Sequence, residues 1–307
     1  MPRQKTKLDS LSVEEREKII QELFENQDGI CYICRQQILL DTQGTDIDHI
    51  IALDKKGIDD INNWGLTHSE CNRSKRTKDL QLQRYLSILE EHIAKYTKSA
   101  ETINAFTVGD ALHEFYPNRK DVTLKIDKNK VLLSFDVEGK TITEEFPLVI
   151  DQNDNSCKSF IGMIPFEYVF HDSTINPRSI VDLALMIEEF YNKNPQLLPS
   201  LAHVDFNEPE GRSKILLFDG QHKAAAQLYI GNKRLFTRVF INTNMQKLKE
   251  VNFRAHTKLA QIHFPQMISD KVGHDIFEEA FNKFLTKYDY AKQKSEADFF
   301  DYWVEPS

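Results

Sequence analysis

Three blocks of sequence near the N-terminus decide the fold: Cys31-Tyr32-Ile33-Cys34, then Asp46-Ile47-Asp48-His49-Ile50, then Asn62-Asn63-Trp64-Gly65-Leu66-Thr67-His68-Ser69-Glu70-Cys71-Asn72-Arg73-Ser74-Lys75. The first and last blocks each carry a pair of soft metal ligands separated by two residues. The middle block and the start of the last carry side chains that move protons or bind hard cations. One short segment therefore combines a candidate structural metal site with candidate catalytic residues.

The soft ligands have the spacing of a structural zinc site. Cys31 and Cys34 form one pair, and His68 and Cys71 form the second about thirty-five residues later. This spacing predicts a tetrahedral Cys3His zinc site. The alternative is a reduced pair of core cysteines with an unrelated His and Cys. The fourth cysteine, Cys157, is expected to be a buried thiol, and so few cysteines suit a reducing cytoplasm.

In this order and spacing the blocks resemble the HNH (ββα-metal) endonucleases with a zinc-stapled core, over roughly residues 1–100. Many members of that family have Cys where this chain has His68. The resemblance implies that His49 is a general base and that Asn63 accepts a hydrogen bond from its second ring nitrogen. It also implies that Asp48 and Asn72 hold one hard divalent cation, Mg²⁺ or another, for phosphodiester hydrolysis.

Each of these residues has a plain structural alternative when it is taken singly. An Asp-His pair in a loop is usually a solvated turn, and an Asn-Asn pair before Trp64 is usually a turn or a helix cap. Between two zinc knuckles the residues reinforce one another, so the set favours a nuclease site. Asp46 would share a face with Asp48 on a strand and is a candidate to support the cation's ligands.

Basic residues follow the last knuckle at the start of an expected closing helix that runs to about Lys98, with Leu82, Leu86 and Leu89 on one face. They are predicted to contact DNA phosphates without reading sequence, and they are Arg73, Lys75, Arg76 and Lys78. The alternative is a solvated helix face. Upstream, the capping-box pattern that begins at Ser12 predicts a scaffold helix through about Asn26.

Length and charge limit the remaining possibilities. A chain of 307 residues suggests two domains, and no apolar run reaches the ~20 residues of a membrane span. The charged N-terminus lacks the apolar core of a secretory signal, so a cytoplasmic protein is expected. The net charge is -8, and residues 1–100 carry 15 Lys and Arg against 17 Asp and Glu. Most of the net negative charge therefore lies in residues 101–307, so any DNA-binding surface must be a local basic patch.

The second half of the sequence predicts a mixed sheet with helices. Short β-branched runs bounded by turns are typical of strands, and the first three runs should form hairpins. The expected strands are Val122–Ile126, Val131–Val137, Thr141–Ile150, Ala202–Phe206, Lys214–Phe218 and Arg238–Asn242, with a helix over Val181–Lys193.

The segment Asp219-Gly220-Gln221-His222-Lys223 at a strand-to-helix turn resembles the DGQHR-type domains of bacterial DNA-modification and defence systems, within the ParB/sulfiredoxin-like fold, over roughly residues 160–260. The resemblance implies that this loop, with Arg178 as a second clamp, binds a nucleotide or nucleic-acid phosphate. Physically, Gly220 permits close backbone approach and a helix start offers free amide donors. Lys223 stands where the family usually has Arg. The alternative is that Asp219 and Gln221 only cap the helix.

The sequence as a whole predicts an α+β protein with two domains. Residues 1–100 would form a ββα-metal HNH endonuclease domain, and residues 101–307 a ParB/sulfiredoxin-like sensor or nucleotide-binding domain, joined near residues 98–108. The expected context is restriction or anti-phage defence, by analogy of fold. The runner-up is a nucleotide-binding regulator or NTPase that uses the zinc module to dock on DNA. Partners compatible with these interpretations are DNA, a nucleotide, other defence-system proteins and a second copy of the chain, with no membrane.

Overall fold

The computed structural model describes residues 5–97, 106–137, 139–175, 178–252 and 254. The chain divides into two compact units, Met1–Asn242 and Thr243–Ser307. In the second unit, residues 245–252 are helical. Residues 98–105 of the expected linker, and Pro177, lie outside the described residues. All the sheets and the remaining helices of the described residues belong to the first unit.

Two capped helices open the chain. Helix α1 spans Lys7–Ser10 and helix α2 spans Val13–Asn26, and each starts at a capping box. In this motif the hydroxyl of the N-cap residue accepts from the backbone amide of the third helical residue, and the carboxylate of that third residue accepts from the backbone amide of the N-cap residue. For α2 the pair is Ser12 and Glu15. The helix predicted from that motif is therefore confirmed, with its end at Asn26.

A small two-stranded sheet follows the helices. Strand β1, Thr45–His49, pairs antiparallel with β2, Trp64–His68, so that Asp48 lies opposite Gly65. The connecting loop carries two turns of 3-10 helix, η1 (Leu53–Lys55) and η2 (Ile61–Asn63), and α3 (Ser69–Ser74) follows β2 directly. A compact core holds these elements together, built from buried side chains that include Leu23, Ile33, Ile47, Trp64 and Leu66.

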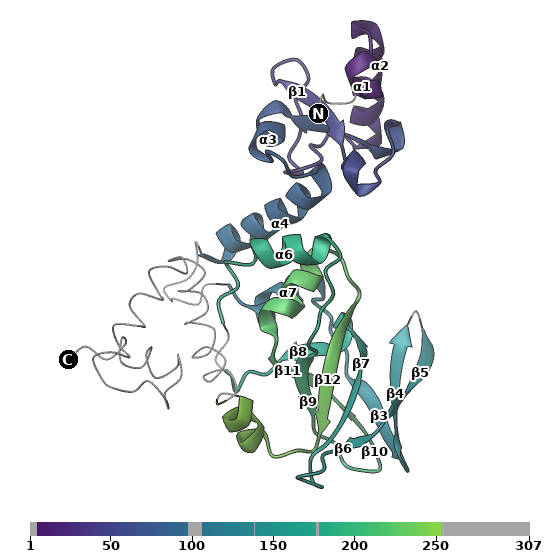
Figure 1. The fold of residues 1–307 in the computed structure, drawn as a ribbon, viewed down its shortest axis with the longest axis vertical. Helices are drawn as coiled ribbons and strands as arrows, with labels where there is room; N and C mark the ends of the chain where they lie inside the picture. Colours follow the sequence, from purple (N-terminus) through teal and green to yellow (C-terminus); the bar gives the residue numbers. More distant parts are fainter. Residues whose placement is uncertain (1–4, 98–105, 138, 176–177, 253, 255–307) are drawn as a thin grey trace, which may run out of the picture. The chain divides into compact units, whose positions relative to one another are not determined.

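Helix α4, Leu80–Thr97, is separate from α3, so the prediction of one closing helix that begins among the basic residues is wrong. The chain turns where Arg76 adopts a left-handed backbone with φ of 56°. Asp79 then restarts the helix, because its Oδ1 accepts from the amide of Leu82 at 2.9 Å. Leu80 belongs to the small N-terminal core, whereas Leu82 and two further leucines of α4 belong to a larger core. In Figure 1, α4 runs from the small N-terminal part to α6 and α7.

A four-stranded antiparallel sheet has the order β10-β3-β4-β5. Its strands are β3 (Val122–Asp127), β4 (Lys130–Val137), β5 (Lys140–Pro147) and β10 (Glu210–Ser213). The two predicted hairpins pair as expected, with Leu124 opposite Leu133 and Phe135 opposite Ile142. The third predicted strand, Thr141–Ile150, is too long, because its last two residues belong to the other sheet. Alternate residues of β3 and β4 are fully buried, which gives this sheet one core face.

A six-stranded mixed sheet has the order β6-β7-β12-β9-β11-β8. Strands β12 and β9 are parallel, as are β11 and β8, and the other pairs are antiparallel. Its strands are β6 (Val149–Ile150), β7 (Lys158–Pro165), β8 (Val169–His171), β9 (Ser200–Val204), β11 (Ile215–Asp219) and β12 (Arg234–Ile241). The predicted strand at Arg238 in fact begins at Arg234, and β7 was not predicted.

Helices pack with this sheet in the larger core. They are α5 (Val108–Phe115), α6 (Ala184–Tyr191) and α7 (Gln221–Tyr229), and a short η3 (Phe166–Tyr168) joins β7 to β8. The helix predicted from Val181 therefore starts later, at Ala184. Fully buried Val239, Ala202 and Leu217 supply the sheet's core face. The protein is of mixed α+β class, and none of the described helices is long and apolar enough to cross a membrane.

Candidate functional site

Cys31, Cys34, His68 and Cys71 converge on one point. One ligand atom from each lies within 4.8 Å of all the others. The His68 Nδ1 is 3.4 Å from the Cys34 Sγ and 3.8 Å from the Cys71 Sγ. A tetrahedral zinc with bonds of about 2.3 Å to sulfur and about 2.0–2.1 Å to nitrogen separates its ligands by roughly 3.5–3.8 Å. The Cys3His group therefore fits a zinc ion.

The backbone around the group fixes the ring of His68. Its Nε2 lies 3.2 Å from the carbonyl oxygen of Gln37, which leaves Nδ1 to face the thiols. Such an outer hydrogen bond sets the tautomer of a metal-binding histidine. Burial, together with the neighbouring thiols, raises the pKa of Cys71 to about 12. A divalent cation offsets that cost by favouring the thiolates, so the donor set has the chemistry of a metal centre.

His49 lies at the end of β1 between two carboxylates. Its Nε2 is 2.9 Å from Oδ1 of Asp59, and its Nδ1 is 3.8 Å from Oδ1 of Asp48. The second oxygen of Asp59 accepts from the backbone amide of Lys7 at 2.7 Å. That bond, more than the one to His49, lowers the pKa of Asp59. The ring is thus oriented by Asp59, and its Nδ1 is directed toward Asp48.

Asn63 does not hold His49, so the expected hydrogen bond between the two is wrong. Its Nδ2 donates to the carbonyl oxygens of Ile51 and Ile58 at 2.9 and 2.8 Å, and its Oδ1 accepts from the amide of Ile51 at 2.9 Å. Asn63 is buried, with 6% of its surface exposed. An amide with three backbone contacts fixes the loop that follows His49, because it supplies both a donor and an acceptor.

Gly57 lets this loop close around Asn63. A Cβ at Gly57 would lie 2.0 Å from the carbonyl oxygen of Ile51 and 2.7 Å from Nδ2 of Asn63. Since one of these atoms belongs to the backbone, no side chain fits without moving the loop. The sequence carries a glycine here because Asn63 needs the space for its hydrogen bonds.

Asn72, on α3, presents an oxygen without a partner. Its Nδ2 donates to Oδ2 of Asp46 at 3.3 Å, whereas its Oδ1 is buried and accepts no hydrogen bond from any described residue. Buried polar atoms are normally satisfied, so an orphaned oxygen needs an explanation such as an ion. Oxygen is the ligand that Mg²⁺ and similar cations take. Asn72 therefore fits the predicted role of cation ligand, with Asp46 orienting its amide.

Asp48 faces the only buried lysine among the described residues. Oδ2 of Asp48 is 2.9 Å from Nζ of Lys75, which also donates to the carbonyl oxygen of Lys78 at 3.0 Å. Lys75 was predicted to lie with Arg73, Arg76 and Lys78 as a surface contact for DNA. Arg73 and Arg76 are exposed and Lys78 is half-buried, but Lys75 is 9% exposed. Its ammonium thus lies at the site itself, next to a predicted cation ligand.

Comparison with known proteins finds one similarity, which lies in this segment. Residues 31–78 match the family model of the HNH endonucleases. No curated protein and no solved structure matches the chain. The matched segment begins at Cys31 of the Cys3His group and ends at Lys78, and it contains His49, Asn63 and Asn72. This segment is therefore similar in sequence to the HNH endonucleases, which suggests a metal-dependent nuclease.

The second predicted site lies at the turn from β11 to α7. Gly220 has a φ of 78°, the left-handed region that favours glycine, and a Cβ there would lie 2.6 Å from Oγ of Ser200. The buried Oγ of Ser200 has no hydrogen-bond partner among the described residues. The amide of Arg178 donates to Oε1 of Gln221 at 2.9 Å, which brings the two predicted clamp segments together. The side chain of Gln221 is therefore hydrogen-bonded to the backbone.

The polar side chains of Asp219, His222 and Lys223 in this turn are partly exposed. Nζ of Lys223 is 3.4 Å from the carbonyl oxygen of Leu198. His222 is half-buried, as are Asp219 and Lys223, so the turn is accessible from solvent. Among the predicted residues of this second site, Arg178 and Gln221 are in contact, through the backbone amide of Arg178.

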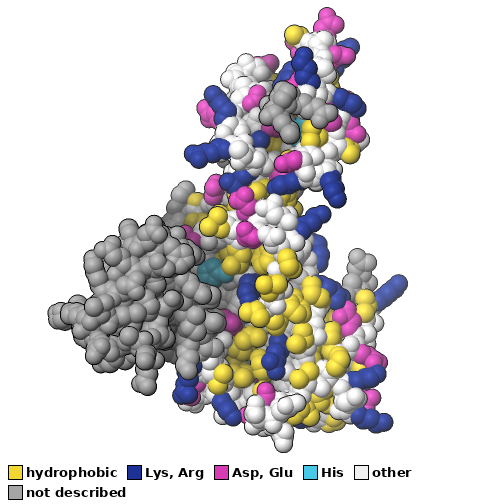
Figure 2. All heavy atoms as spheres, in the orientation of Figure 1, with side chains coloured by type: hydrophobic (Ala, Val, Ile, Leu, Met, Phe, Trp, Pro, Cys, Tyr) yellow, Lys and Arg dark blue, Asp and Glu magenta, His cyan; other side chains and the backbone are white. Residues whose placement is uncertain are grey.

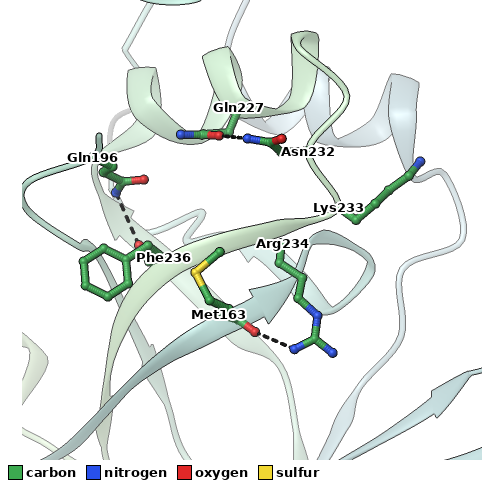
Figure 3. Close-up of a pocket in the computed structure, with 7 residues that line it drawn as sticks. All are labelled: Met163, Gln196, Gln227, Asn232, Lys233, Arg234 and Phe236. Carbon is green, nitrogen blue, oxygen red and sulfur yellow. Dashed lines mark hydrogen bonds between the residues drawn. The ribbon is translucent and has the colours of Figure 1, made fainter. Parts of the chain in front are cut away.

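A cavity of about 530 Å³ lies elsewhere on the sheet and contains none of these predicted residues. Figure 3 shows its walls, with Met163 and Phe236 on the strands and the bonded amides of Gln227 and Asn232 above them; Gln196, Lys233 and Arg234 complete the lining. Phe236 lies opposite Met163 across β12 and β7. Figure 2 shows hydrophobic side chains gathered on the face where Figure 1 places β7 and β12. Met163, on β7, is 46% exposed.

Sequence reasoning missed Asp59 and the inward position of Lys75. Asp59 follows His49 by ten residues in an irregular loop, so no periodicity connects the two. Lys75 looks like its basic neighbours in sequence. It lies at the C-cap of α3, directly before the left-handed turn at Arg76, and no residue type indicates such a turn at an arginine.

Proposed function

We propose that the protein is a DNA endonuclease that hydrolyses phosphodiester bonds with the help of a divalent cation. The observation that carries this proposal is the orphaned, buried Oδ1 of Asn72 inside the segment that matches the HNH endonucleases. A module that only docks on DNA has no need for an unsatisfied oxygen ligand in a segment that also carries His49. The match itself supports a metal-dependent nuclease, and DNA as the substrate of such a nuclease.

In this proposal His49 takes a proton from the attacking water at Nδ1. Asp48 and Asn72 would hold the cation, Mg²⁺ or another, which when bound neutralises charge on the phosphate and the leaving oxygen. Asn63 fixes the loop after His49, and Lys75 adds positive charge beside Asp48. The Cys3His zinc serves as a staple, because a core this small gains much of its stability from a bound metal.

We propose that DNA lies along the exposed basic residues that follow the zinc ligands. Arg73 and Arg76 are exposed, and neither makes an ion pair with any described residue. Contacts of this kind neutralise backbone phosphates and position the duplex without reading its sequence. The net charge of -8 for the chain supports a narrow track, because the rest of the surface repels DNA.

We further propose that residues 101–307 form a sensor that binds a nucleotide or a DNA phosphate at the turn from Asp219 to Lys223. Support comes from the left-handed Gly220, the orphaned Oγ of Ser200 beside it, and the start of α7. Arg178 would form the second clamp. The proposed setting is restriction or anti-phage defence, where such a domain would license cutting by residues 1–100.

The deciding experiment measures cation dependence. Supercoiled plasmid is incubated with the full chain in Mg²⁺, in Mn²⁺ and without added cation, while elemental analysis follows bound zinc. We expect nicked or linear product only when a divalent cation is added to zinc-loaded protein. Equal cutting without added cation, or no cutting under any condition including added nucleotides and modified DNA, would contradict the proposal. Turnover of nucleotide without any cutting would favour the NTPase alternative.

A further inference from the structure

Asp59 stands in a relationship to His49 that the matched motif does not account for. The motif residues around His49 are Asp48, Asn63 and Asn72, and none of them contacts Nε2 of its ring among the described residues. Asp59 makes that contact at 2.9 Å. The His49 side chain is 11% exposed, so the ring cannot turn freely away from this partner.

We infer that Asp59 is a positioning residue for His49, forming an Asp-His dyad that is itself held by the N-terminal segment through the backbone amide of Lys7. This inference rests on the proposed function of His49 as the base. It adds Asp59, which is not one of the motif residues named above, and the segment of Lys7, which lies outside the matched range of 31–78.

The geometry specifies what the dyad does. A carboxylate only accepts hydrogen bonds, so Asp59 requires the proton of a neutral His49 to be on Nε2. The lone pair is then on Nδ1, the nitrogen 3.8 Å from Asp48, on the side of the predicted cation ligand. A carboxylate that holds a catalytic imidazole in the useful tautomer acts in this way in other hydrolases.

The N-terminal segment completes the arrangement. Oδ2 of Asp59 accepts from the amide of Lys7 at 2.7 Å, while Oδ1 faces His49. Lys7 is the first residue of α1, where an amide has no partner within its own helix. Asp59 satisfies that amide, and the amide in turn limits rotation of the carboxylate. The link therefore runs from α1 through Asp59 to the proposed base.

The primary test is a double-mutant cycle on the full, zinc-loaded chain. Asp59→Asn keeps the shape of the side chain but adds a donor, so it favours the wrong tautomer of His49. We expect kcat for duplex DNA to fall on the order of 10²- to 10⁴-fold with KM little changed. In a His49→Ala background the same substitution should cause no further loss, because the partner is gone. Asp60→Asn, at the neighbouring carboxylate that caps η2, is the matched control.

A second pair of variants covers the case in which Asp59→Asn folds poorly. Lys7→Pro removes the amide proton at a first helical position, where proline is well tolerated, and Lys7→Ala keeps it. We expect kcat of the proline variant to be roughly two- to tenfold below that of the alanine variant, as for one lost hydrogen bond. Equal rates in the two variants would remove the N-terminal segment from the arrangement.

A spectroscopic readout separates failure of this inference from failure of the proposed function. In ¹⁵N-histidine-labelled protein without added cation, neutral His49 should carry its proton on Nε2, and Asp59→Asn should move it toward Nδ1. If His49→Ala abolishes cutting while Asp59→Asn cuts at the wild-type rate, the dyad is wrong and the nuclease stands. If His49→Ala cuts normally, the base assignment is wrong, and the tautomer measurement alone decides whether Asp59 orients the ring.

Discussion

Asn72 donates one hydrogen bond to Asp46, 3.3 Å away, and this bond turns the other end of the amide into a buried position without a partner. Asp46 lies on β1 opposite Thr67, and Asn72 lies on α3, so strand and helix together aim the oxygen. Asp46 thus orients the side-chain amide of Asn72. This arrangement makes the ligand role of Asn72 open to a direct test.

Asn72→Ala removes the orphaned oxygen. We expect the concentration of Mg²⁺ or Mn²⁺ that gives half-maximal cutting to rise at least about tenfold, since even indirect partners of metal ligands contribute 10- to 100-fold. A cation titration of plasmid cleavage measures this. Glu70→Ala, on an exposed residue of the same short helix, controls for changes in α3. An unchanged cation requirement in Asn72→Ala would exclude the residue as a ligand.

Cys31→Ser should release zinc and unfold the small N-terminal core, because Cys31 is fully buried in that core and supplies a ligand. Zinc binding contributes about 10–16 kcal/mol in zinc-finger peptides near neutral pH. Elemental analysis and thermal melting follow the two effects. Cys157→Ser is the matched control, since that buried cysteine lies outside the Cys3His group. Full zinc occupancy in Cys31→Ser would show that the four residues do not form the structural zinc site.

Zinc affinity should rise as the pH is raised from about 6 to about 8. The pKa of Cys71 is raised to about 12 by burial and by the neighbouring thiols, and burial also raises the pKa of Cys34. Without metal, the thiols of Cys34 and Cys71 are therefore protonated throughout this range. Binding releases those protons, so it becomes more favourable as their concentration falls. Competition with a chromophoric chelator at several pH values measures the slope, and a slope of zero would contradict thiolate ligation.

The sequence predicted the composition of the site better than its hydrogen bonds. Ligand spacing located the Cys3His group, because two knuckles of fixed spacing leave few other arrangements, and the capping box located α2. Asn63 and Lys75 were assigned to wrong contacts, since a motif names residues but not the direction of each side chain. Strand β7 was missed because it has Gly162 and Met163 in its middle, where glycine is uncommon in strands. The turn at Arg76, which divides α3 from α4, has no sequence signal.

Asp79→Ala should destabilise the junction between α3 and α4. Asp79 is 4% exposed, its Oδ1 caps α4 at Leu82, and its Oδ2 accepts from the hydroxyl of Tyr191 on α6 at 2.9 Å. Loss of the cap and of the partner for a partly buried hydroxyl should lower the free energy of unfolding by about 1–3 kcal/mol. Urea denaturation measures the change. Asp182→Ala, at an exposed carboxylate, should change it by less than about 0.5 kcal/mol.

Lys223→Ala should weaken binding of a nucleotide or a DNA phosphate by roughly ten- to a hundredfold, as expected when one charge-assisted contact is lost. Calorimetry on the full chain measures the affinity. Lys233→Ala, in the cavity of Figure 3, is the matched control, because it removes the same charge at a separate position. A larger loss in the Lys233 variant would move the proposed ligand to that cavity. No binding by the wild-type chain would leave Asp219 and Gln221 as structural residues of the turn.

The most direct test of a cation-dependent nuclease centred on His49 is single-turnover cleavage of a duplex by His49→Ala and by wild type. Both proteins should contain the same amount of zinc, because His49 is not among the four zinc ligands. We predict that the variant cuts about 10²- to 10⁴-fold more slowly, which is the usual contribution of a general base. Cleavage by zinc-loaded His49→Ala at a rate close to that of wild type would contradict the account.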